Sequence, residues 1–258
     1  MTTTGQRTPP LEGGRNFRDL GGYEGVGGRR VKWGRVFRSG SLAGLTQADW
    51  DSLRAQGVRT LCDFRTTPER EREPFPWLDE PGFTYFKRDY ANSSGELRKL
   101  LAGETPPSAE AAREAMRLRY VDIPFEQAPS YRRLFDCLRR EETPLIFNCS
   151  AGKDRAGTAA ALVLTALGVN RETVIEDYLL TNQAVDLMTA LAAGPGTAPT
   201  VTRARSDVAR AVLNADQIYI ETALDTVDER HGGIEGYLDE VLEIDAAGLA
   251  AIREHLLE

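Results

Sequence analysis

Short apolar runs recur along the chain and alternate with longer amphipathic stretches. The runs predict buried strands at residues 58–64, 82–86 and 145–149, with one or two further strands within 31–38. Strands that alternate with helices indicate a mostly parallel sheet whose two faces are both covered. The pattern therefore predicts an α/β fold with a central sheet flanked by helices.

The amphipathic stretches predict helices. The clearest covers residues 45–56, because its apolar side chains fall near one face, Thr46 can cap its first turn and Gly57 can end it. Such helices would pack on the sheet and on one another. Beyond the glycine at 157 almost every segment has a helical pattern, and we expect helices at 158–167, 171–191, 206–230, 233–242 and 246–257, with a flexible break at 194–199.

Two segments interrupt this organisation. The polar residues 1–13 are expected to form a flexible leader, ahead of a stretch rich in glycine and turns. Residues 91–128 hold two short helical patterns, at 96–101 and 108–119, around a Gly-Glu-Thr-Pro-Pro break. A connection this long in a compact domain is usually a lid or a disordered excursion. We expect a helical lid, inserted into a single domain that spans residues 1–258.

Composition and charge narrow the class of protein. With 258 residues, 41% of them hydrophobic, the chain can bury one sizeable core. Its net charge of −7 and the lack of a dominant basic stripe argue against a nucleic-acid-binding protein. No apolar segment has the length that a membrane span or a signal peptide needs. We expect a soluble cytoplasmic protein without membrane insertion, and export without a signal peptide stays open.

Cysteine and histidine usage points away from disulfides and metals. The three cysteines, Cys62, Cys137 and Cys149, are odd in number and widely spaced, which favours a reducing compartment. The first two are expected to be packing residues. The two histidines, His231 and His255, lie far along the chain from the cysteines, so neither a zinc site nor a serine–histidine pair is expected. We predict no metal and no cofactor.

The candidate chemistry lies between the run at 145–149 and the helical pattern after it. Residues 148–157 read Asn-Cys-Ser-Ala-Gly-Lys-Asp-Arg-Ala-Gly. The backbone from Cys149 to Arg155 can surround an anion, because Gly152 lets amides point inward and the helix N-terminus adds partial positive charge. This predicts a phosphate-binding loop, formed by Ser150, Ala151, Gly152, Lys153, Asp154 and Arg155.

Cys149 is the candidate nucleophile of this loop. The spacing of cysteine and arginine alone often arises by chance, but a strand before it and a helix after it are the context that an anion loop needs. Amides, a guanidinium and a helix N-terminus all favour the thiolate form of a cysteine. We therefore interpret Cys149 as catalytic rather than as a small buried hydrophobic residue, and the chain as a cysteine-dependent phosphatase.

Several motifs together resemble one family. They are CSAGKDR at 149–155, NFRDLGG at 16–22, FRSGSL at 37–42, DFR at 63–65 and DYLLTN at 177–182. In this order they resemble the bacterial atypical tyrosine phosphatases, from about Gly14 to the C-terminus. The resemblance implies a protein-tyrosine-phosphatase-like fold, a helical lid and no metal. It also implies a phosphorylated protein or a phosphoinositide as the substrate, with phosphotyrosine first and phosphoserine or phosphothreonine in some members.

The expected mechanism has Cys149 attack phosphorus, which gives a phosphocysteine that water then hydrolyses, while the loop amides and arginine stabilise the equatorial oxygens. A carboxyl group must protonate the leaving oxygen. The resemblance assigns that role first to Asp154, whose alternative is to cap the following helix. Asp63 is the second candidate, and its alternative is an ion pair with Lys153 or Arg65.

Lys153 bears on specificity. A lysine in the loop could meet a second phosphate, as a phosphoinositide phosphatase requires, or it could serve only in an ion pair. Together with Arg15, Arg18 and Arg65 it could raise the positive charge of one pocket. Arg18 and Asp19 are expected to hold the glycine-rich turn rather than to touch substrate.

Two residues depart from the pattern of the family and keep other functions open. Asn148 stands where a histidine usually precedes the cysteine. Ala156 stands where a serine or threonine usually follows the arginine, and the missing hydroxyl could slow hydrolysis of phosphocysteine. Both favour the alternative of a catalytically weak phospho-ligand-binding module. A thiol transferase of the rhodanese or arsenate-reductase kind is a further alternative, although the nearest cysteine for the latter, Cys137, lies on a predicted helix.

Overall fold

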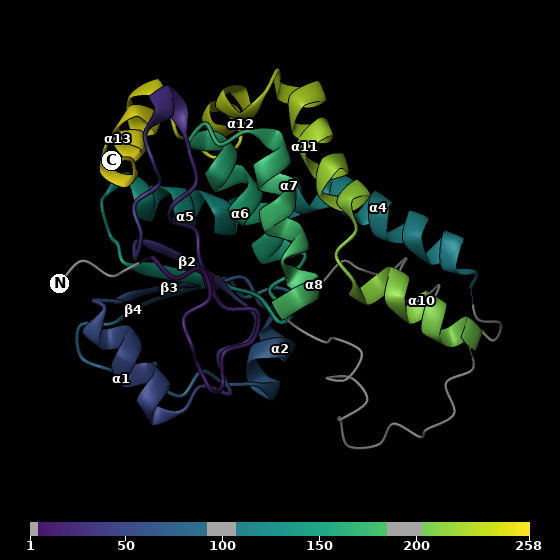
Figure 1. Cartoon of the computed structure of the whole chain (residues 1–258), viewed down its shortest axis with the longest axis horizontal. Coiled ribbons are helices and arrows are strands. Elements are labelled where there is room, and N and C mark those ends of the chain that lie inside the picture. Colours follow the sequence, from purple (N-terminus) through teal and green to yellow (C-terminus); the bar gives the residue numbers. More distant parts are fainter. Residues whose placement is uncertain (1–4, 92–106, 185–202) are drawn as a thin grey trace.

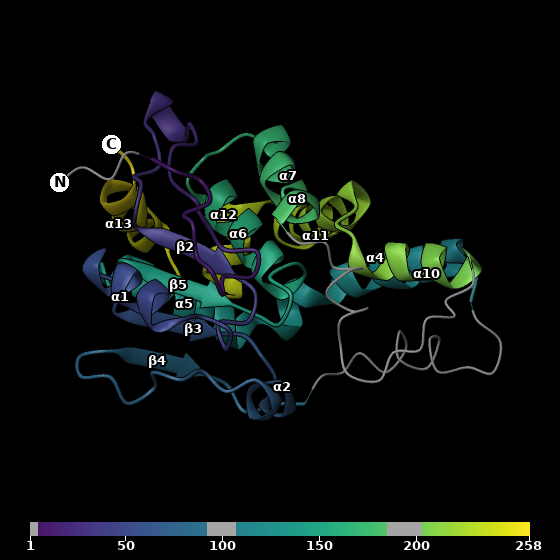
Figure 2. The same ribbon diagram turned by 60° about the horizontal axis from the view of Figure 1, so that its bottom comes forward.

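The central sheet (Figure 1) has its strands in the order β1-β2-β5-β3-β4, and Figure 2 shows β2, β5, β3 and β4 in this order. The computed structural model describes residues 5–91, 107–184 and 203–258. The strands within them are β1 (Arg18–Asp19), β2 (Val36–Ser39), β3 (Thr60–Asp63), β4 (Thr84–Lys87) and β5 (Leu145–Asn148). The short β1 is antiparallel to β2, whereas the other three pairings are parallel. The predicted α/β fold with a mostly parallel sheet is confirmed.

Strand β5 lies in the middle of the sheet and brings the candidate loop to its edge. Asn148, the last residue of β5, is in register with Ser39 on one side and with Asp63 on the other. Three parallel strands therefore end at one level. The loops that follow them share one edge of the sheet, which is where ligands bind in folds of this kind.

Helices cover both faces of the sheet, as Figures 1 and 2 show. One face carries α5 (Ala128–Arg139) and α6 (Arg155–Ala166), which belong to the larger apolar core. The other face carries α1 (Gln47–Ala55) and an aromatic cluster in which the rings of Trp50 and Trp77 stack 5.2 Å apart. The side chains of β2, β3 and β5 alternate between these two cores, so these three strands are buried on both sides, whereas the edge strand β4 is partly exposed.

Helix α1 forms as its sequence predicts. The Thr46 side chain accepts from the amide of Asp49, and the Asp49 side chain accepts from the amide of Thr46, which makes a capping box. Gly57 follows the helix with a φ of 89°. The Asp49 carboxylate also accepts from the amides of Glu12 and Gly13, at 2.8 and 2.9 Å. This part of the expected flexible leader is therefore bound to the domain.

The other elements are a 3-10 turn and helices that lie mostly after the loop. They are the turn Val26–Gly28, α2 (Thr67–Arg72), α4 (Ala109–Glu126), α7 (Arg171–Leu179), α8 (Thr181–Ala184), α10 (Arg203–Leu213), α11 (Gln217–His231), α12 (Ile234–Glu240) and α13 (Ala246–Leu256). Within the described residues no helix has both the length and the apolar character that crossing a membrane requires.

The prediction of a single helix at 206–230 was wrong, because the helical structure is interrupted between α10 and α11. Asp216 caps α11 by accepting from the amide of Ile218. Asn182 bonds both backbone groups of Ala215, at 2.8 Å each, and so satisfies the polar groups that the break releases. The end of the predicted helix at 171–191 and the break at 194–199 lie outside the described residues.

Helix α4 covers the second half of the segment expected to be a lid, and it is longer than the predicted 108–119. Its Tyr120 and Ile123 are fully buried in the larger core. Figures 1 and 2 show α4 beside α10 and α11. This helix is thus part of the packed domain. Residues 92–106, which include the predicted helix at 96–101, lie outside the described residues, and for them the lid stays a prediction.

Candidate active site

The candidate loop joins β5 to α6 as the sequence predicts. Cys149 follows the last residue of β5, and Arg155 is the first residue of α6. Gly152 turns the loop with a φ of 73°, a left-handed conformation that favours glycine. A Cβ atom there would lie 2.6 Å from the amide nitrogen of Gly40 and 2.8 Å from Asn16 Nδ2. Glycine is therefore required both by the backbone angle and by the close neighbours.

Three consecutive carbonyl groups of the loop are held by donors from the N-terminal part of the chain. These bonds run from the Ser41 amide to the Ser150 carbonyl (2.9 Å), from Asn16 Nδ2 to the Ala151 carbonyl (3.1 Å) and from Arg38 Nη2 to the Gly152 carbonyl (2.8 Å). Two of the motifs that resemble the phosphatases, at 16–22 and 37–42, thus act on the loop from behind.

The held carbonyls fix the direction of the loop amides. The C=O and N–H groups of a trans peptide point in opposite directions, so the N–H groups of Ala151, Gly152 and Lys153 are turned away from those donors. Within the described residues, no amide of residues 150–155 donates to a backbone or side-chain acceptor. These amides and the N-terminus of α6 form a cradle that suits an oxyanion.

A buried ion cluster supports this arrangement. The Asp177 carboxylate of α7 forms ion pairs with Arg38 Nη1 at 2.7 Å and with Arg18 Nε at 3.2 Å. All three side chains are almost fully buried. Burial alone would raise the pKa of Asp177, but the charges of Arg18 and Arg38 lower it to about 2. Arg18 also donates to Asn16 Oδ1 at 2.5 Å. The cluster therefore fixes both side chains, Asn16 and Arg38, that hold the loop.

Asp19 holds the glycine-rich turn, as predicted, whereas Arg18 has a different structural role. The Asp19 carboxylate accepts from the amides of Gly21 and Gly34, at 2.8 and 2.6 Å. Arg18 instead lies in the ion cluster, behind the loop. Arg15 has a 42% exposed side chain that faces Glu73 at 3.8 Å. Arg18 therefore does not contribute to a pocket in front of the loop, contrary to the sequence expectation.

Arg155 is oriented by a carboxylate that the sequence did not indicate. Its Nη1 and Nη2 atoms donate to the two oxygens of Glu69 in α2, at 2.7 Å each, and Nη1 also donates to the Phe64 carbonyl at 3.0 Å. Burial opposes ionisation of Glu69, but Arg155 lowers its pKa to about 2. The Nε of Arg155 donates to no acceptor in the described part of the chain, so its Nε–Nη2 edge can receive two oxygens of a phosphate.

Cys149 lies at the base of the loop, with 2% of its surface exposed. Its amide donates to the Ser39 carbonyl at 3.3 Å. The neighbouring Ala156 is fully buried and brings no hydroxyl to this region. The side-chain polar atoms of Asn148 and the Thr158 hydroxyl are buried and have no partner among the described residues. Neither residue is bonded in a way that replaces the missing hydroxyl.

Asp154 does not cap α6, since its side chain accepts no amide of the helix. It accepts instead from the Tyr120 hydroxyl at 2.7 Å and lies 3.3 Å from Lys153 Nζ. Burial would raise the pKa of Asp154, but the Lys153 charge and the Tyr120 hydrogen bond outweigh burial and lower it. A quarter of the Asp154 side chain is exposed.

Lys153 is buried, and its ammonium group contacts residues other than Asp63. Its Nζ donates to the carbonyls of Val212 and Asn214, at 2.5 and 3.3 Å. These carbonyls lie at the C-terminal end of α10, where an ammonium group is favourable. The lysine therefore ties the candidate loop to α10.

The Asp63 side chain and Cys149 lie on opposite faces of the sheet. The carboxylate accepts from Arg65 Nε at 2.9 Å and Nη2 at 2.7 Å, and from the Tyr85 hydroxyl at 2.9 Å. Tyr85 packs against the aromatic cluster on the α1 face, whereas Cys149 belongs to the larger core on the other face. The ion pair with Arg65, one of the alternatives for Asp63, is thus present.

Sequence reasoning missed Glu69 and Tyr90, which both contact Arg155. Glu69 was visible only as the third residue after Thr66 in a capping box, which it does form. Tyr90 carries no motif. In the described ranges, no three His, Cys, Asp or Glu side chains come together as a metal site.

Comparisons with known proteins agree on one family. The tyrosine phosphatase family model matches residues 9–258. A provisionally named tyrosine-protein phosphatase of Cupriavidus necator is 34% identical, over 91% of this chain and 84% of that protein. The triple specificity protein phosphatase PtpB of Mycobacterium tuberculosis is 30% identical, over 88% and 91% respectively. A tyrosine-protein phosphatase of Nostoc commune is 28% identical, over 55% of this chain and 47% of that protein.

Proposed function

Because the chain belongs to the tyrosine phosphatase family, we propose that it hydrolyses phosphate monoesters through a covalent phosphocysteine at Cys149. The observation that carries the proposal is the loop in which three carbonyls are held from behind and the amides are left for an oxyanion. Cys149 lies beneath that cradle, and Arg155 lies at its end with one donor edge unused.

In the first step the Cys149 thiolate attacks phosphorus, an S–P bond forms and the bond to the leaving oxygen breaks. The leaving oxygen takes a proton from a carboxylic acid. In the second step water attacks phosphorus, gives a proton to the same carboxylate and displaces the thiolate. The loop amides and Arg155 stabilise the equatorial oxygens in both steps.

We assign the proton transfer to Asp154 as the first candidate. Its carboxylate lies in the loop itself and is partly exposed. Asp154 is ionised in the free protein, since its pKa is lowered. A phosphate dianion in the loop would oppose that charge and favour the protonated form, because like charges raise the pKa of a carboxyl group. Asp63, the second candidate, is proposed to act mainly by holding Arg65, to which it is bonded.

Phosphotyrosine is the proposed first substrate, with phosphoserine and phosphothreonine in addition. The name of the relative PtpB, a triple specificity phosphatase, supports this wider range. Phosphoinositide hydrolysis is proposed to depend on Lys153. That lysine would have to leave the carbonyls of Val212 and Asn214 in order to reach a second phosphate.

Phosphate release from a phosphotyrosine peptide and from a panel of phosphoinositides, without added metal, tests the proposal. We expect wild type to turn over the peptide and Cys149→Ser to be inactive. Acid-quenched wild type should carry one phosphoryl group on the peptide that contains Cys149, as seen by mass spectrometry. Turnover that survives in Cys149→Ser would exclude the thiol mechanism.

A second candidate function, a phospho-ligand-binding module, is favoured by one observation. The buried Ala156 offers no hydroxyl to help the thiolate leave. Wild type that binds a phosphotyrosine peptide but releases no phosphate would support the module and overturn the enzyme.

A further inference from the structure

The hydroxyl group of Tyr120 in α4 contacts the carboxylate of Asp154, the first candidate for the acid. Tyr120 is fully buried, and its hydroxyl lies 2.7 Å from Asp154 Oδ1 and 2.7 Å from the Tyr178 hydroxyl of α7. A hydroxyl has one proton to donate, and an ionised carboxylate can only accept. Tyr120 therefore donates to Asp154, and Tyr178 donates to Tyr120.

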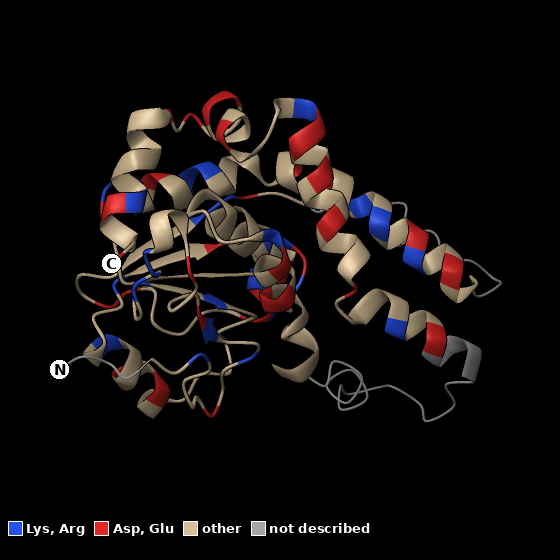
Figure 3. Ribbon diagram, turned by 45° about the horizontal axis from the view of Figure 1, so that its top comes forward, with Lys and Arg blue, Asp and Glu red and all other residues tan. Residues whose placement is uncertain are grey.

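The Tyr120 ring is fixed by packing on more than one side. The Tyr219 ring of α11 stacks on it at 5.4 Å, and the Tyr178 ring meets it edge-on at 6.1 Å. Figure 3 shows basic and acidic residues along α4, of which Arg113 and Arg117 pair with carboxylates at the surface. Helix α4 thus exposes its charged residues and buries Tyr120, and contacts from α7 and α11 set the position of the hydroxyl.

The two oxygens of the Asp154 carboxylate have different surroundings. The Tyr120 hydroxyl and Lys153 Nζ both approach Oδ1, at 2.7 and 3.3 Å. Within the described ranges, Oδ2 accepts no hydrogen bond from the protein. A proton that binds Asp154 therefore lies on Oδ2, because Oδ1 is occupied by donors.

The groups around Asp154 favour its ionised form. Burial would raise its pKa, but the Lys153 charge, the Tyr120 hydrogen bond and the Arg119 charge outweigh burial and lower it. Burial and the Asp154 charge raise the pKa of Tyr120 and of Tyr178 well above the usual value. Both hydroxyls therefore remain protonated donors while Asp154 titrates.

We propose that Tyr120 is a positioning residue for acid catalysis by Asp154, which rests on the proposed phosphatase function. When phosphocysteine forms, the Oδ2–H bond breaks and the proton goes to the leaving oxygen, while Oδ1 stays bonded to Tyr120. The Tyr120 hydrogen bond strengthens as the carboxylate charge develops, because a bond to an ionised acceptor is stronger than one to a neutral acceptor. In the second step Oδ2 takes the proton of the attacking water, and Tyr120 keeps its own proton throughout.

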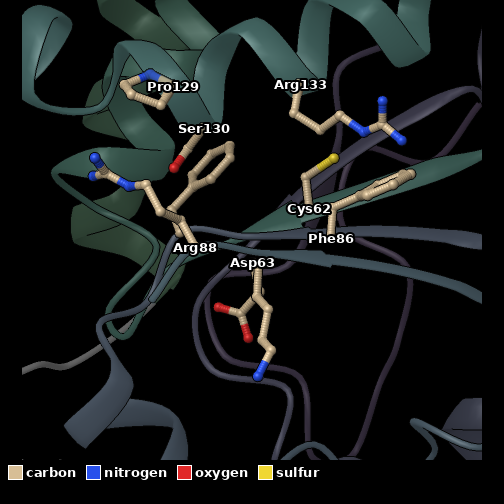
Figure 4. Close-up of a pocket in the computed structure, with 9 residues that line it drawn as sticks. Cys62, Asp63, Phe86, Arg88, Pro129, Ser130 and Arg133 are labelled. Atoms are coloured by element: carbon tan, nitrogen blue, oxygen red, sulfur yellow. The ribbon is translucent and has the colours of Figure 1, made fainter. Parts of the chain in front are cut away.

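The second acid candidate, Asp63, lacks such an arrangement. Figure 4 shows the side chains of Cys62 and Asp63 directed to opposite sides of β3. The Oδ1 of Asp63 accepts from the amide and Nε of Arg65, and its Oδ2 accepts from Arg65 Nη2 and the Tyr85 hydroxyl. Both oxygens of Asp63 are thus held by donors, whereas Asp154 has one held oxygen and one that can carry a proton.

Tyr120→Phe removes the hydroxyl and keeps the packed ring. Its kcat/KM is measured for phenyl phosphate, whose leaving group needs a proton, and for p-nitrophenyl phosphate, whose nitrophenolate leaves without one. We expect kcat/KM to fall about tenfold for phenyl phosphate, as the loss of one hydrogen bond to a charged group predicts, and less than about twofold for p-nitrophenyl phosphate. Asp154→Asn should show the same selectivity with a larger loss, of about a hundredfold or more.

Tyr237→Phe is the matched control. It removes a buried tyrosine hydroxyl that donates to the Pro124 carbonyl of α4 at 2.6 Å rather than to Asp154. It should hydrolyse both substrates as wild type does. Tyr178→Phe, which removes the donor to Tyr120, should lose activity on phenyl phosphate in the same sense but by less than Tyr120→Phe.

Carbon-13 NMR of the Asp154 carboxyl gives a second readout, which does not depend on turnover. The pKa of Asp154 should be higher in Tyr120→Phe than in wild type, because the carboxylate loses a donor. An unchanged pKa, or equal losses of kcat/KM with the two substrates, would overturn the role of Tyr120.

The same variants separate the role of Tyr120 from the proposed function. Turnover of either substrate by Cys149→Ser would overturn both. A selective loss in Asp154→Asn together with normal kinetics in Tyr120→Phe would overturn the role of Tyr120 alone. Normal kinetics in Asp154→Asn would also overturn that role and leave the phosphatase with another acid.

Discussion

Arg155 and Glu69 face each other end to end, with each terminal nitrogen of the guanidinium 2.7 Å from one oxygen of the carboxylate. This pairing uses the Nη1–Nη2 edge of Arg155 and leaves the Nε–Nη2 edge for a phosphate. Glu69 also accepts from the Thr66 amide at 2.7 Å, which fixes it to the start of α2. The orientation of the loop arginine thus depends on a helix that belongs to another part of the sequence.

Glu69→Gln should therefore weaken phosphate binding and turnover. The amide cannot pair with both nitrogens of Arg155, so the arginine loses its orientation. Hydrogen bonds to a charged group are worth about 1.5–3 kcal/mol, which predicts a loss of about ten- to a hundredfold in kcat/KM. Steady-state kinetics and the affinity for vanadate measure the effect. Glu71→Gln, an exposed position on the same helix, should change neither, and equal losses in both variants would contradict the assignment.

Asn16→Asp tests whether the held carbonyls matter for catalysis. The change removes the Nδ2 donor to the Ala151 carbonyl, keeps the acceptor for Arg18 and suits the positive φ of 52° at this residue. We expect kcat/KM to fall about tenfold or more, because an oxygen facing the carbonyl disturbs the loop. Asn182→Asp, which loses a comparable bond to the Ala215 carbonyl, is the control and should keep its phosphate affinity. Normal kinetics in Asn16→Asp would show that the hydrogen bond from Asn16 to the Ala151 carbonyl does not matter for catalysis.

Asp177 predicts a specific dependence of stability on pH. Its pKa is about 2 in the folded protein and near 3.8 in the unfolded chain, because Arg18 and Arg38 favour the carboxylate. The stabilisation is present above about pH 4 and is lost as the pH falls toward 2, since the unfolded state then binds a proton more readily. Urea unfolding of wild type between pH 5 and 2 should show this decline.

Asp177→Asn should lack that part of the pH dependence. It leaves two buried arginines without a counter-charge, which is expected to cost about 3–5 kcal/mol at neutral pH. The same slope between pH 4 and 2 in both proteins would show that Asp177 does not titrate as described.

Ala156→Ser should accelerate hydrolysis of the proposed phosphocysteine. A hydroxyl at this position can donate to the sulfur of Cys149 and stabilise the leaving thiolate, by about 1.5 kcal/mol or roughly tenfold. Rapid-quench kinetics should show less accumulated phosphocysteine and a higher kcat. The neighbouring Ala159→Ser adds a hydroxyl one turn further along α6 and serves as control. A lower kcat with unchanged accumulation would indicate that Ala156 is needed for packing.

The local features of this protein could be predicted because each depends on a few neighbouring residues. Thr46 and Gly57 define α1 by hydrogen bonds and backbone angles within one turn. The apolar run before Cys149 and the helical pattern after it define the strand, loop and helix. Where the prediction was wrong, as for the single helix at 206–230, a residue distant in the sequence decided where the helix breaks. Asn182 bonds Ala215 and stabilises a break that the apolar pattern alone did not reveal.

The sequence by itself determined the strand, loop and helix around Cys149, the mostly parallel α/β fold and the family, because each of these rests on short runs of neighbouring residues. Only the tertiary structure decided what holds the loop. Glu69 lies 86 residues from Arg155, Arg38 lies 114 residues from Gly152, and Asn16 lies 135 residues from Ala151. They meet because the sheet order places β5 between β2 and β3, so that loops from three separate parts of the chain end at one edge.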